Sequence, residues 1–326
     1  MRTEVERTRV PLAEMRTAGV IMAERISRPV GIRGRCYTCG MAPRAYIGIS
    51  GYDYPGWAKR FYPEGLPRRA WLRFAGEAFD SVELNGTFYS LKSPDVFERW
   101  AAETPARFVF AVKGSRFLTH NLKLRRAEGA LANFYASGVL ALGRKTGPFL
   151  WQLPASYGFD ADRIDSFLRL LPKTSDEAAD LARGHDERLV TPRRVRGGRR
   201  GALVASPVKV RYRHALEVRH PSYFVPEFYE LLRRHRCAFV VADTAGKFGY
   251  AEEVTAPFVY VRLHGSRQLY TSGYTPDELD AWAAKIRGWM GAGRDVYVYF
   301  DNDAHGHAPF DAMGLAARMG GEKDKP

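Results

Sequence analysis

The chain has 326 residues, an ordinary apolar content of 45% and a formal net charge of +14. No apolar run approaches the roughly 18–20 residues of a membrane-spanning helix, and no secretory leader is recognisable, so we expect a cytoplasmic protein without membrane contact. The positive charge is concentrated, because residues 1–45 contribute +5 and residues 183–213 contribute +8. The rest of the chain is close to neutral, which argues against a nucleic-acid-binding face on its body.

Residues 1–45 show no sustained apolar period and are rich in Arg, Thr, Gly and Pro, so we predict a flexible extension. Cys36 and Cys39 form a CxxC pair inside this extension. No second CxxC or HxxxH follows at zinc-finger spacing, and we therefore do not expect a functional site there. Cys237 lies at an apolar junction and is expected to be a small core residue.

From Tyr46 onward, short runs rich in Val, Phe, Tyr and Ile predict eight strands. They are residues 46–50, 81–85, 108–113, 149–154, 214–220, 238–243, 258–264 and 295–302. Helical patterns separate most of them, at residues 66–79, 94–102, 128–143, 160–171, 226–236, 276–290 and 310–319, and only the connection after the sixth strand is too short for a full helix.

Eight strands alternating with helices predict a single (β/α)₈ TIM barrel over residues 46–320. Residues 183–213 would then form a basic insertion before the fifth strand, and residues 321–326 a short tail. The alternative is a doubly wound sheet, but it would want a glycine-rich first turn, and Gly48 and Gly51 lack the GxGxxG spacing.

The alternation of each strand predicts which side chains face the barrel interior. At the carboxyl ends of the strands, where barrel enzymes hold their active sites, the predicted inward residues are polar. They are Ser50, Glu83, Asn85, Lys113, Gln152, Glu217, Arg219, Asp243, Arg262, His264 and Asp301. Buried polar networks also occur in barrels for purely structural reasons, yet burying this many charges is costly, so the ring predicts a functional site.

Three kinds of chemistry fit this ring, in decreasing order of preference. Cationic side chains could hold an anionic substrate such as a carboxylate or phosphate, with Glu83 or Glu217 as general base. Alternatively, Glu83, Glu217, Asp243 and His264 could bind a divalent metal, as in sugar-isomerase-like barrels, although the neighbouring cations oppose this. Finally, Glu83 and Glu217 could form a glycosidase pair.

We expect an enzyme that acts by acid–base chemistry on a small anionic or polyhydroxylated molecule, without a predicted cofactor. The expected catalytic residues are Glu83, Lys113, Glu217 and His264. Expected substrate-binding residues are Tyr52, Tyr54, Trp57, Asn85, Tyr89, Gln152, Arg219, His220, Asp243, Arg262 and Asn302. The alternative partner is a nucleic acid held by the basic segment 193–200, which lacks the interleaved aromatic residues that stack on bases and is better explained as a solvated loop.

Seven ordered motifs resemble the YecE-like proteins, the domain-of-unknown-function family 72. They are GISGYDY at 48–54 with Trp57, VELNGTFY at 82–89, FVFAVK at 108–113, WQLP at 151–154, EVRHPS at 217–222, YVRLHG at 260–265 and YVYFDN at 297–302. The resemblance runs from about Tyr46 to Leu315 and implies a TIM barrel in the bacterial cytoplasm, without implying a reaction. Tyr223 and Asp311 depart from the family pattern, where Trp and Asn are expected.

Overall fold

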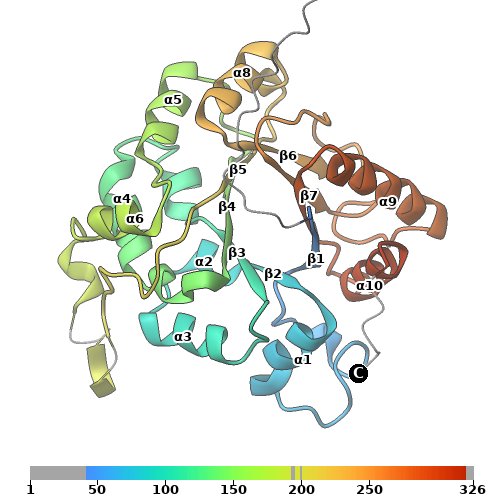
Figure 1. Ribbon diagram of the computed structural model, residues 1–326, viewed down its shortest axis with the longest axis horizontal. Helices are drawn as coiled ribbons and strands as arrows, with labels where there is room; N and C mark the ends of the chain where they lie inside the picture. Colours follow the sequence, from blue (N-terminus) through green and yellow to red (C-terminus); the bar gives the residue numbers. More distant parts are fainter. Residues whose placement is uncertain (1–41, 192–194, 199, 321–326) are drawn as a thin grey trace, which may run out of the picture. The chain divides into compact units, whose positions relative to one another are not determined.

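The computed structural model describes residues 42–191, 195–198 and 200–320. Eight parallel strands close into a barrel in chain order, which confirms the predicted (β/α)₈ fold (Figure 1). The strands are β1 (Ala45–Ser50), β2 (Ser81–Leu84), β3 (Val109–Lys113), β4 (Thr146–Gln152), β5 (His214–Glu217), β6 (Ala238–Asp243), β7 (Phe258–Leu263) and β8 (Asp295–Phe300). The predicted extension, with its CxxC pair, and the tail at 321–326 lie almost entirely outside the described residues.

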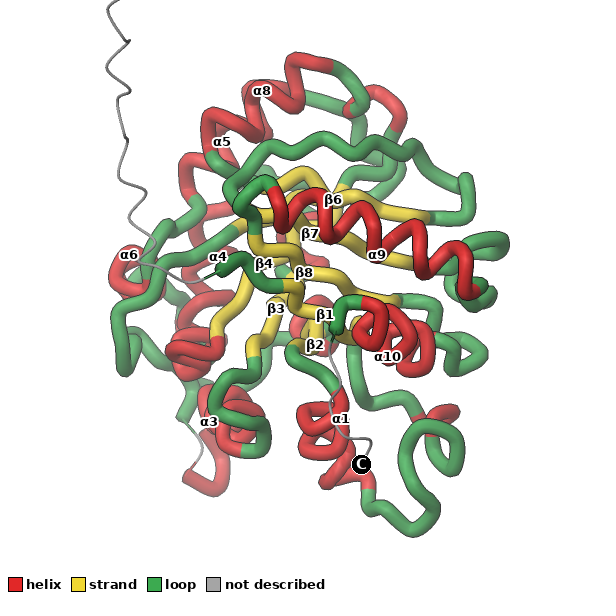
Figure 2. Tube along the Cα trace, turned by 45° about the vertical axis from the view of Figure 1, so that its right-hand side comes forward, coloured by secondary structure: helices red, strands yellow, loops and turns green. Residues whose placement is uncertain are grey.

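Helices surround the barrel, as the tube in Figure 2 shows for α9 and α10 beside β8 and β1. They are α1 (Trp71–Ala78), α2 (Gly86–Tyr89), α3 (Pro94–Ala102), α4 (Ala127–Ala136), α5 (Ala161–Leu170), α6 (Ser175–Ala182), α8 (Pro226–His235), α9 (Pro276–Gly291) and α10 (Ala308–Arg318). None of these helices is long and apolar enough to cross a membrane, a finding that covers only the described part of the chain.

Three helices, α3, α8 and α9, begin at prolines, namely Pro94, Pro226 and Pro276. Ser93 occupies the N-cap position of α3, but its side chain makes no capping hydrogen bond. Thr275 forms a complete capping box with Glu278 at the start of α9. The segment after β6, residues 244–257, contains no helix, as predicted.

Two short helices were not predicted. Residues 86–89, expected to be a loop, form the single turn α2 directly after β2. The helix α6 precedes the basic insertion and starts from Thr174, whose hydroxyl accepts a hydrogen bond from the amide of Glu177. Both are too short for the apolar period to identify them.

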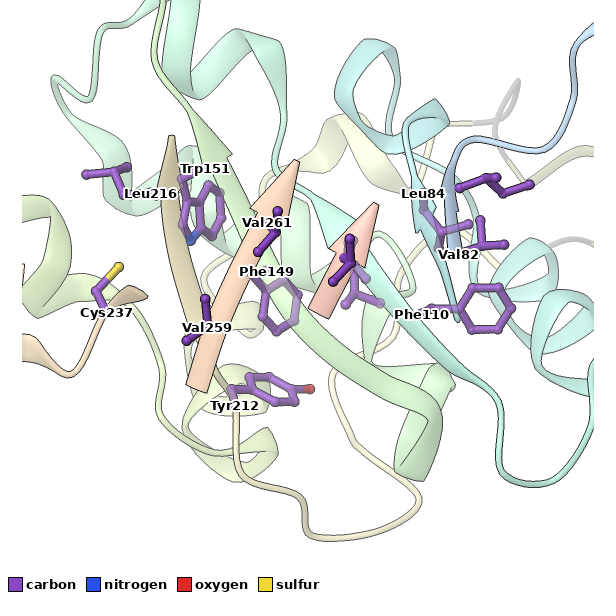
Figure 3. Close-up of a cluster of buried hydrophobic side chains, with 14 of the residues drawn as sticks. Val82, Leu84, Phe110, Phe149, Trp151, Tyr212, Leu216, Cys237, Val259 and Val261 are labelled. Atoms are coloured by element: carbon purple, nitrogen blue, oxygen red, sulfur yellow. The ribbon is translucent and has the colours of Figure 1, made fainter. Parts of the chain in front are cut away.

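Two separate apolar layers lie on the two sides of the sheet. Outward-facing residues such as Val82, Phe110 and Val261 pack against the helices, and Figure 3 shows part of this outer layer together with the buried Cys237. A smaller cluster that includes Leu150 and Tyr260 fills the barrel interior. Because the strands are covered on both faces, the polar ring can occupy only the open carboxyl end.

The basic insertion is less free than its charge suggests. Among its described cations, Arg188 pairs with Asp186 of the insertion itself, while three others pair with acidic residues of the surrounding helices, in the pairs Arg183–Asp180, Arg200–Asp95 and Lys209–Asp176. The backbone amide of Leu203 also donates a hydrogen bond to the carbonyl of Ala136 in α4. Part of the candidate nucleic-acid segment 193–200 lies outside the described residues, and its described Arg200 is occupied by two carboxylates, those of Asp95 and Glu98.

Candidate active site at the barrel mouth

Arg262 is the centre of the polar ring. It lies on β7, its side chain is fully buried, and its guanidinium contacts three carboxylates. Nη1 donates to Glu217 Oε2 at 2.7 Å, while Nη2 donates to Glu83 Oε1 and to Asp301 Oδ2, both at 2.8 Å. Nε donates to Glu83 Oε2 at 3.1 Å, which makes the Glu83 contact bidentate. A planar donor fork suits this geometry, and a lysine could not replace it.

Glu83 has both carboxylate oxygens occupied by the protein. Besides Arg262, it accepts hydrogen bonds from Ser50 Oγ and from Tyr260 Oη, the latter at 2.6 Å. Burial, together with the negative charge of Glu83, raises the pKa of Tyr260 well above its ordinary value, so the phenol stays protonated and remains a donor. Glu83 therefore has the contacts of a residue that positions Arg262, and an inbound ligand would have to displace one of them.

Glu217, on β5, is held in the same way. Its Oε1 accepts from Gln152 Nε2 at 2.7 Å and from Arg219 Nε at 3.0 Å. Burial would raise the pKa of Glu217, but the positive charges of Arg262 and Arg219 outweigh this and hold it well below its ordinary value. A carboxylate in this state is a weak base. It is also a poor general acid, which disfavours the alternative of a Glu83–Glu217 glycosidase pair.

Asp301 and His264 complete the buried part of the ring. His264 Nδ1 lies 3.0 Å from Asp301 Oδ2, although without the alignment of a full hydrogen bond, and Arg262 Nη1 lies 3.2 Å from His264 Nε2. Burial and the charge of Arg262 lower the pKa of His264, so the imidazole is neutral. With Lys113, Arg219 and Arg262 opposite Glu83, Glu217 and Asp301, the ring as a whole carries no net charge.

Lys113 differs from the other cations of the ring. It ends β3, and Thr87 Oγ1 fixes its backbone by donating to its carbonyl oxygen at 2.7 Å. Its Nζ lies 4.6 Å from the centre of the Phe88 ring, and no hydrogen bond or salt bridge joins it to any described residue. Burial and the nearby Arg262 lower the pKa of Lys113 to about 8. Near neutral pH the amine thus has accessible charged and uncharged forms.

The Phe88 ring beside Lys113 contacts two further rings. The buried Phe88 contacts His120 edge to face, with ring centroids 5.1 Å apart, and contacts Tyr89 with centroids 5.0 Å apart. Burial and the charge of Lys113 lower the pKa of His120 to about 4, so His120 adds no charge at neutral pH. Tyr89 is 75% exposed, the most exposed large apolar side chain among the described residues. Tyr89 therefore presents an aromatic ring to solvent next to Phe88.

Several predicted mouth residues lie elsewhere. Trp57 is buried in an aromatic cluster with Tyr54 and Phe61, and it packs as core. The Tyr52 phenol contacts Trp100, on the outer side of the barrel. The expectation that Trp57 and Tyr52 face a ligand is wrong, because the turn after β1 directs both side chains into the packing layer between the loop and the helices.

Three further predicted residues serve local structure. Asp243 lies on the same face of β6 as the outward-facing residues Phe239 and Val241. Its carboxylate accepts hydrogen bonds from Tyr274 Oη and from the amide of Ala245, so its predicted inward orientation is wrong. Asn302 Nδ2 donates to Asp311 Oδ2 and to a loop carbonyl, which ties β8 to the start of α10. His220 Nδ1 caps its own turn by accepting from the Ser222 amide.

Asn85 and Tyr54 lie at the edge of the ring, where both form hydrogen bonds to Ser50. Asn85 Nδ2 donates to Ser50 Oγ at 2.8 Å, and Tyr54 Oη donates to the Ser50 carbonyl at 2.8 Å. The Oδ1 of Asn85 is buried without a hydrogen-bond partner in the structure. It is an acceptor that remains available to a ligand hydroxyl.

The sequence-based list omitted residues that the structure brings into the network. Tyr260 bonds Glu83, and it could have been found, because it precedes Arg262 by two residues on the same face of β7. Tyr270 Oη accepts from Arg219 Nη2 at 3.0 Å, but it comes from the loop after β7, where no periodicity predicts orientation. The same is true of His120, which follows β3.

The proposed metal set of Glu83, Glu217, Asp243 and His264 is not assembled. Arg262 lies between the two glutamates and occupies oxygens of both, while Asp243 faces Tyr274. Across the described residues, no group of three or more His, Cys, Asp or Glu side chains has the arrangement of a metal site. The donor set therefore does not fit a divalent cation.

Comparison with known proteins identifies relatives of this chain. A family model described as "Protein of unknown function DUF72" matches residues 46–326. The UPF0759 protein YecE of Escherichia coli K12 is 26% identical over 182 residues, which cover 53% of this chain and 64% of that protein, less than two thirds of its length. A DUF72 family protein of Thermotoga maritima has a solved structure with 25% identity and a TM-score of 0.66, covering 85% of this chain and 99% of that chain. A DUF72 family protein of Enterococcus faecalis, with 14% identity and a TM-score of 0.63, covers 86% and 97% and shares the fold.

Proposed function

We propose a function from the chemistry of the site itself. This chain belongs to the DUF72 family, and the description of that family states no activity. The barrel mouth binds a small anionic or polyhydroxylated molecule, and Lys113 transfers a proton to or from it. The observation that carries this proposal is the state of Lys113. It is the ring cation without a carboxylate partner in the described chain, and its pKa is lowered to about 8 by burial and Arg262.

The other charged groups of the ring support this role because they are bound to one another. Three carboxylates are bound to Arg262, so they keep its charge balanced and leave the Lys113 ammonium as the available anion-binding group. In its uncharged form Lys113 is a base suited to neutral pH. The expected bases Glu83 and Glu217 then act as positioning residues that hold Arg262 and Arg219 in place.

A thermal-shift screen against a library of sugar acids, sugar phosphates and polyols tests the proposal. The matched variants are Lys113→Met and Lys173→Met, because Lys173 is exposed and lies beside the segment that enters β5 at the opposite end of the barrel. We expect a compound of this class to raise the melting temperature of the parent and of Lys173→Met, but not of Lys113→Met. No selective ligand, or an equal shift in Lys113→Met, would refute the proposal.

A further inference from the structure

We propose that Lys113 is a nucleophile that forms an imine with a small aldehyde or ketone at the barrel mouth. This inference rests on the proposed function, because it uses the same site, and it adds the chemical class of the substrate. It assigns Lys113 a covalent role, whereas proton transfer alone would not require a carbonyl group on the ligand.

The position of the amine carries the argument. Lysines at functional sites are ordinarily hydrogen-bonded to carboxylates, which hold the amine protonated and lower its nucleophilicity. Here every ring carboxylate is bound to Arg262, and Lys113 Nζ instead lies 4.6 Å from the Phe88 ring. The aromatic ring removes water from one side of the amine; its face attracts the charged form, but it supplies no carboxylate.

The charges around Lys113 explain how the uncharged amine persists. Arg262 opposes its protonation, while Asp301, Glu83 and Glu217 favour it at longer range, and desolvation exceeds them all. His120, across the Phe88 ring, is neutral because burial and Lys113 lower its pKa. Lysines activated by an apolar surface and a neighbouring cation are the kind that form Schiff bases.

The chemical step balances without a further reactant. The Lys113 nitrogen lone pair forms a bond to the carbonyl carbon while the carbonyl π electrons move onto the oxygen, and transfer of one amine proton from nitrogen to that oxygen gives a neutral carbinolamine. Loss of the hydroxyl group with a proton from solvent releases one water and leaves a protonated carbon–nitrogen double bond. That bond accepts electrons from the adjacent carbon, so proton removal or carbon–carbon cleavage can follow.

The backbone holds the amine in place for such a step. The carbonyl of Lys113 accepts from Thr87 Oγ1, and the next amide, that of Gly114, donates to the Leu150 carbonyl at 2.8 Å. A side-chain atom on Gly114 would meet the Trp151 ring at 2.2 Å, so this turn of the chain cannot shift to accommodate a larger residue. The nucleophile is thus carried on a rigid strand end.

Borohydride trapping tests the inference. The protein is incubated with pyruvate, an anionic ketone, or with glycolaldehyde, a neutral aldehyde, and sodium borohydride is added to reduce any imine to a stable amine. Peptide mass spectrometry then locates the adduct. We expect an adduct on Lys113 at probe concentrations that leave the exposed Lys173 unmodified, with a labelling rate that increases with pH and has its midpoint near the Lys113 pKa of about 8.

The control variant is Lys113→Arg, which keeps a positive charge but cannot form an imine, and circular dichroism is used to check that it folds. We expect this variant to lose the adduct. Equal labelling of Lys113 and Lys173 would refute the imine. A probe that raises the melting temperature through the Lys113 site but gives no adduct would refute the imine and leave the proposed binding function standing. If these probes give no adduct and the library screen finds no selective ligand, both are refuted.

Discussion

Replacing Arg262 by methionine should strongly destabilise the fold, and the structure gives the size of the effect. The substitution keeps most of the side-chain volume and removes the cation that Glu83, Glu217 and Asp301 share, although Arg219 still contacts Glu217. Removing one partner of a buried ion pair costs about 3–5 kcal/mol, because the remaining charge is buried without compensation. Three carboxylates share this arginine, so we expect a loss of at least that size. For a chain of this length, it corresponds to a melting temperature lower by roughly 6–20 °C.

The pH dependence separates this explanation from a simple packing defect. In the parent, the charge of Arg262 outweighs burial and lowers the pKa values of Glu217 and Asp301. These two groups therefore stabilise the folded state at pH values above their unfolded pKa, and this stabilisation is lost as the pH falls. Arg262 is the largest influence that opposes burial at both groups, so without it we expect burial to outweigh the remaining cations and to raise both pKa values above those of the unfolded chain. The native variant then binds more protons than its unfolded state, and its stability should increase between about pH 7 and pH 5.

Urea unfolding at several pH values measures both effects. The matched control is Arg68→Met, because Arg68 also forms a bidentate contact, to Asp53 at 2.5 and 2.9 Å, but on an exposed surface. We expect the control to leave the free energy of unfolding nearly unchanged at every pH, because an exposed ion pair is screened by water. A loss of under about 1 kcal/mol in Arg262→Met, or a deficit that stays constant as the pH falls, would contradict the reasoning.

Three other predictions concern residues away from the guanidinium. Trp57→Ala should lower the unfolding free energy by about 3–5 kcal/mol, whereas Tyr89→Ala should change it by less than about 0.5 kcal/mol; similar values in chemical denaturation would contradict the burial of Trp57. Gly48→Ala should destabilise by at least about 1–3 kcal/mol, since its Cβ would lie 1.8 Å from the carbonyl oxygen of Ser81, and an unchanged melting temperature would argue against this close contact. Burial lowers the pKa of His214 to about 4, so the parent should lose on the order of 3 kcal/mol between pH 6.5 and pH 4 through this group. His214→Gln should flatten that part of the stability profile, and an equally steep profile in the variant would refute the assignment.

Much of the fold could be predicted from the sequence, because the information is local. Runs of β-branched and aromatic residues at regular intervals gave eight strands, and alternation within a strand placed Glu83, Lys113 and Arg262 in the interior. The same rule failed for Asp243. Since β6 is covered on both faces, its residues 238–242 are all apolar, and polarity cannot show on which side of the strand Asp243 lies.

Only the closed barrel decides which charges meet. Glu83 and Arg262 are 179 residues apart in the sequence. The alternation within β2 and within β7 does not specify that one guanidinium will bind three carboxylates. Trp57 and Tyr270 lie outside the strands, where no sequence periodicity predicts side-chain orientation. Only tertiary packing buries Trp57 in the core and brings the Tyr270 hydroxyl to Arg219. The isolation of Lys113 follows from the same closure, because Arg262 occupies the acids that would otherwise hold the lysine charged. Strand alternation could place Lys113 at the mouth, but its pKa depends on the distances to Phe88 and Arg262, which exist only in the folded chain.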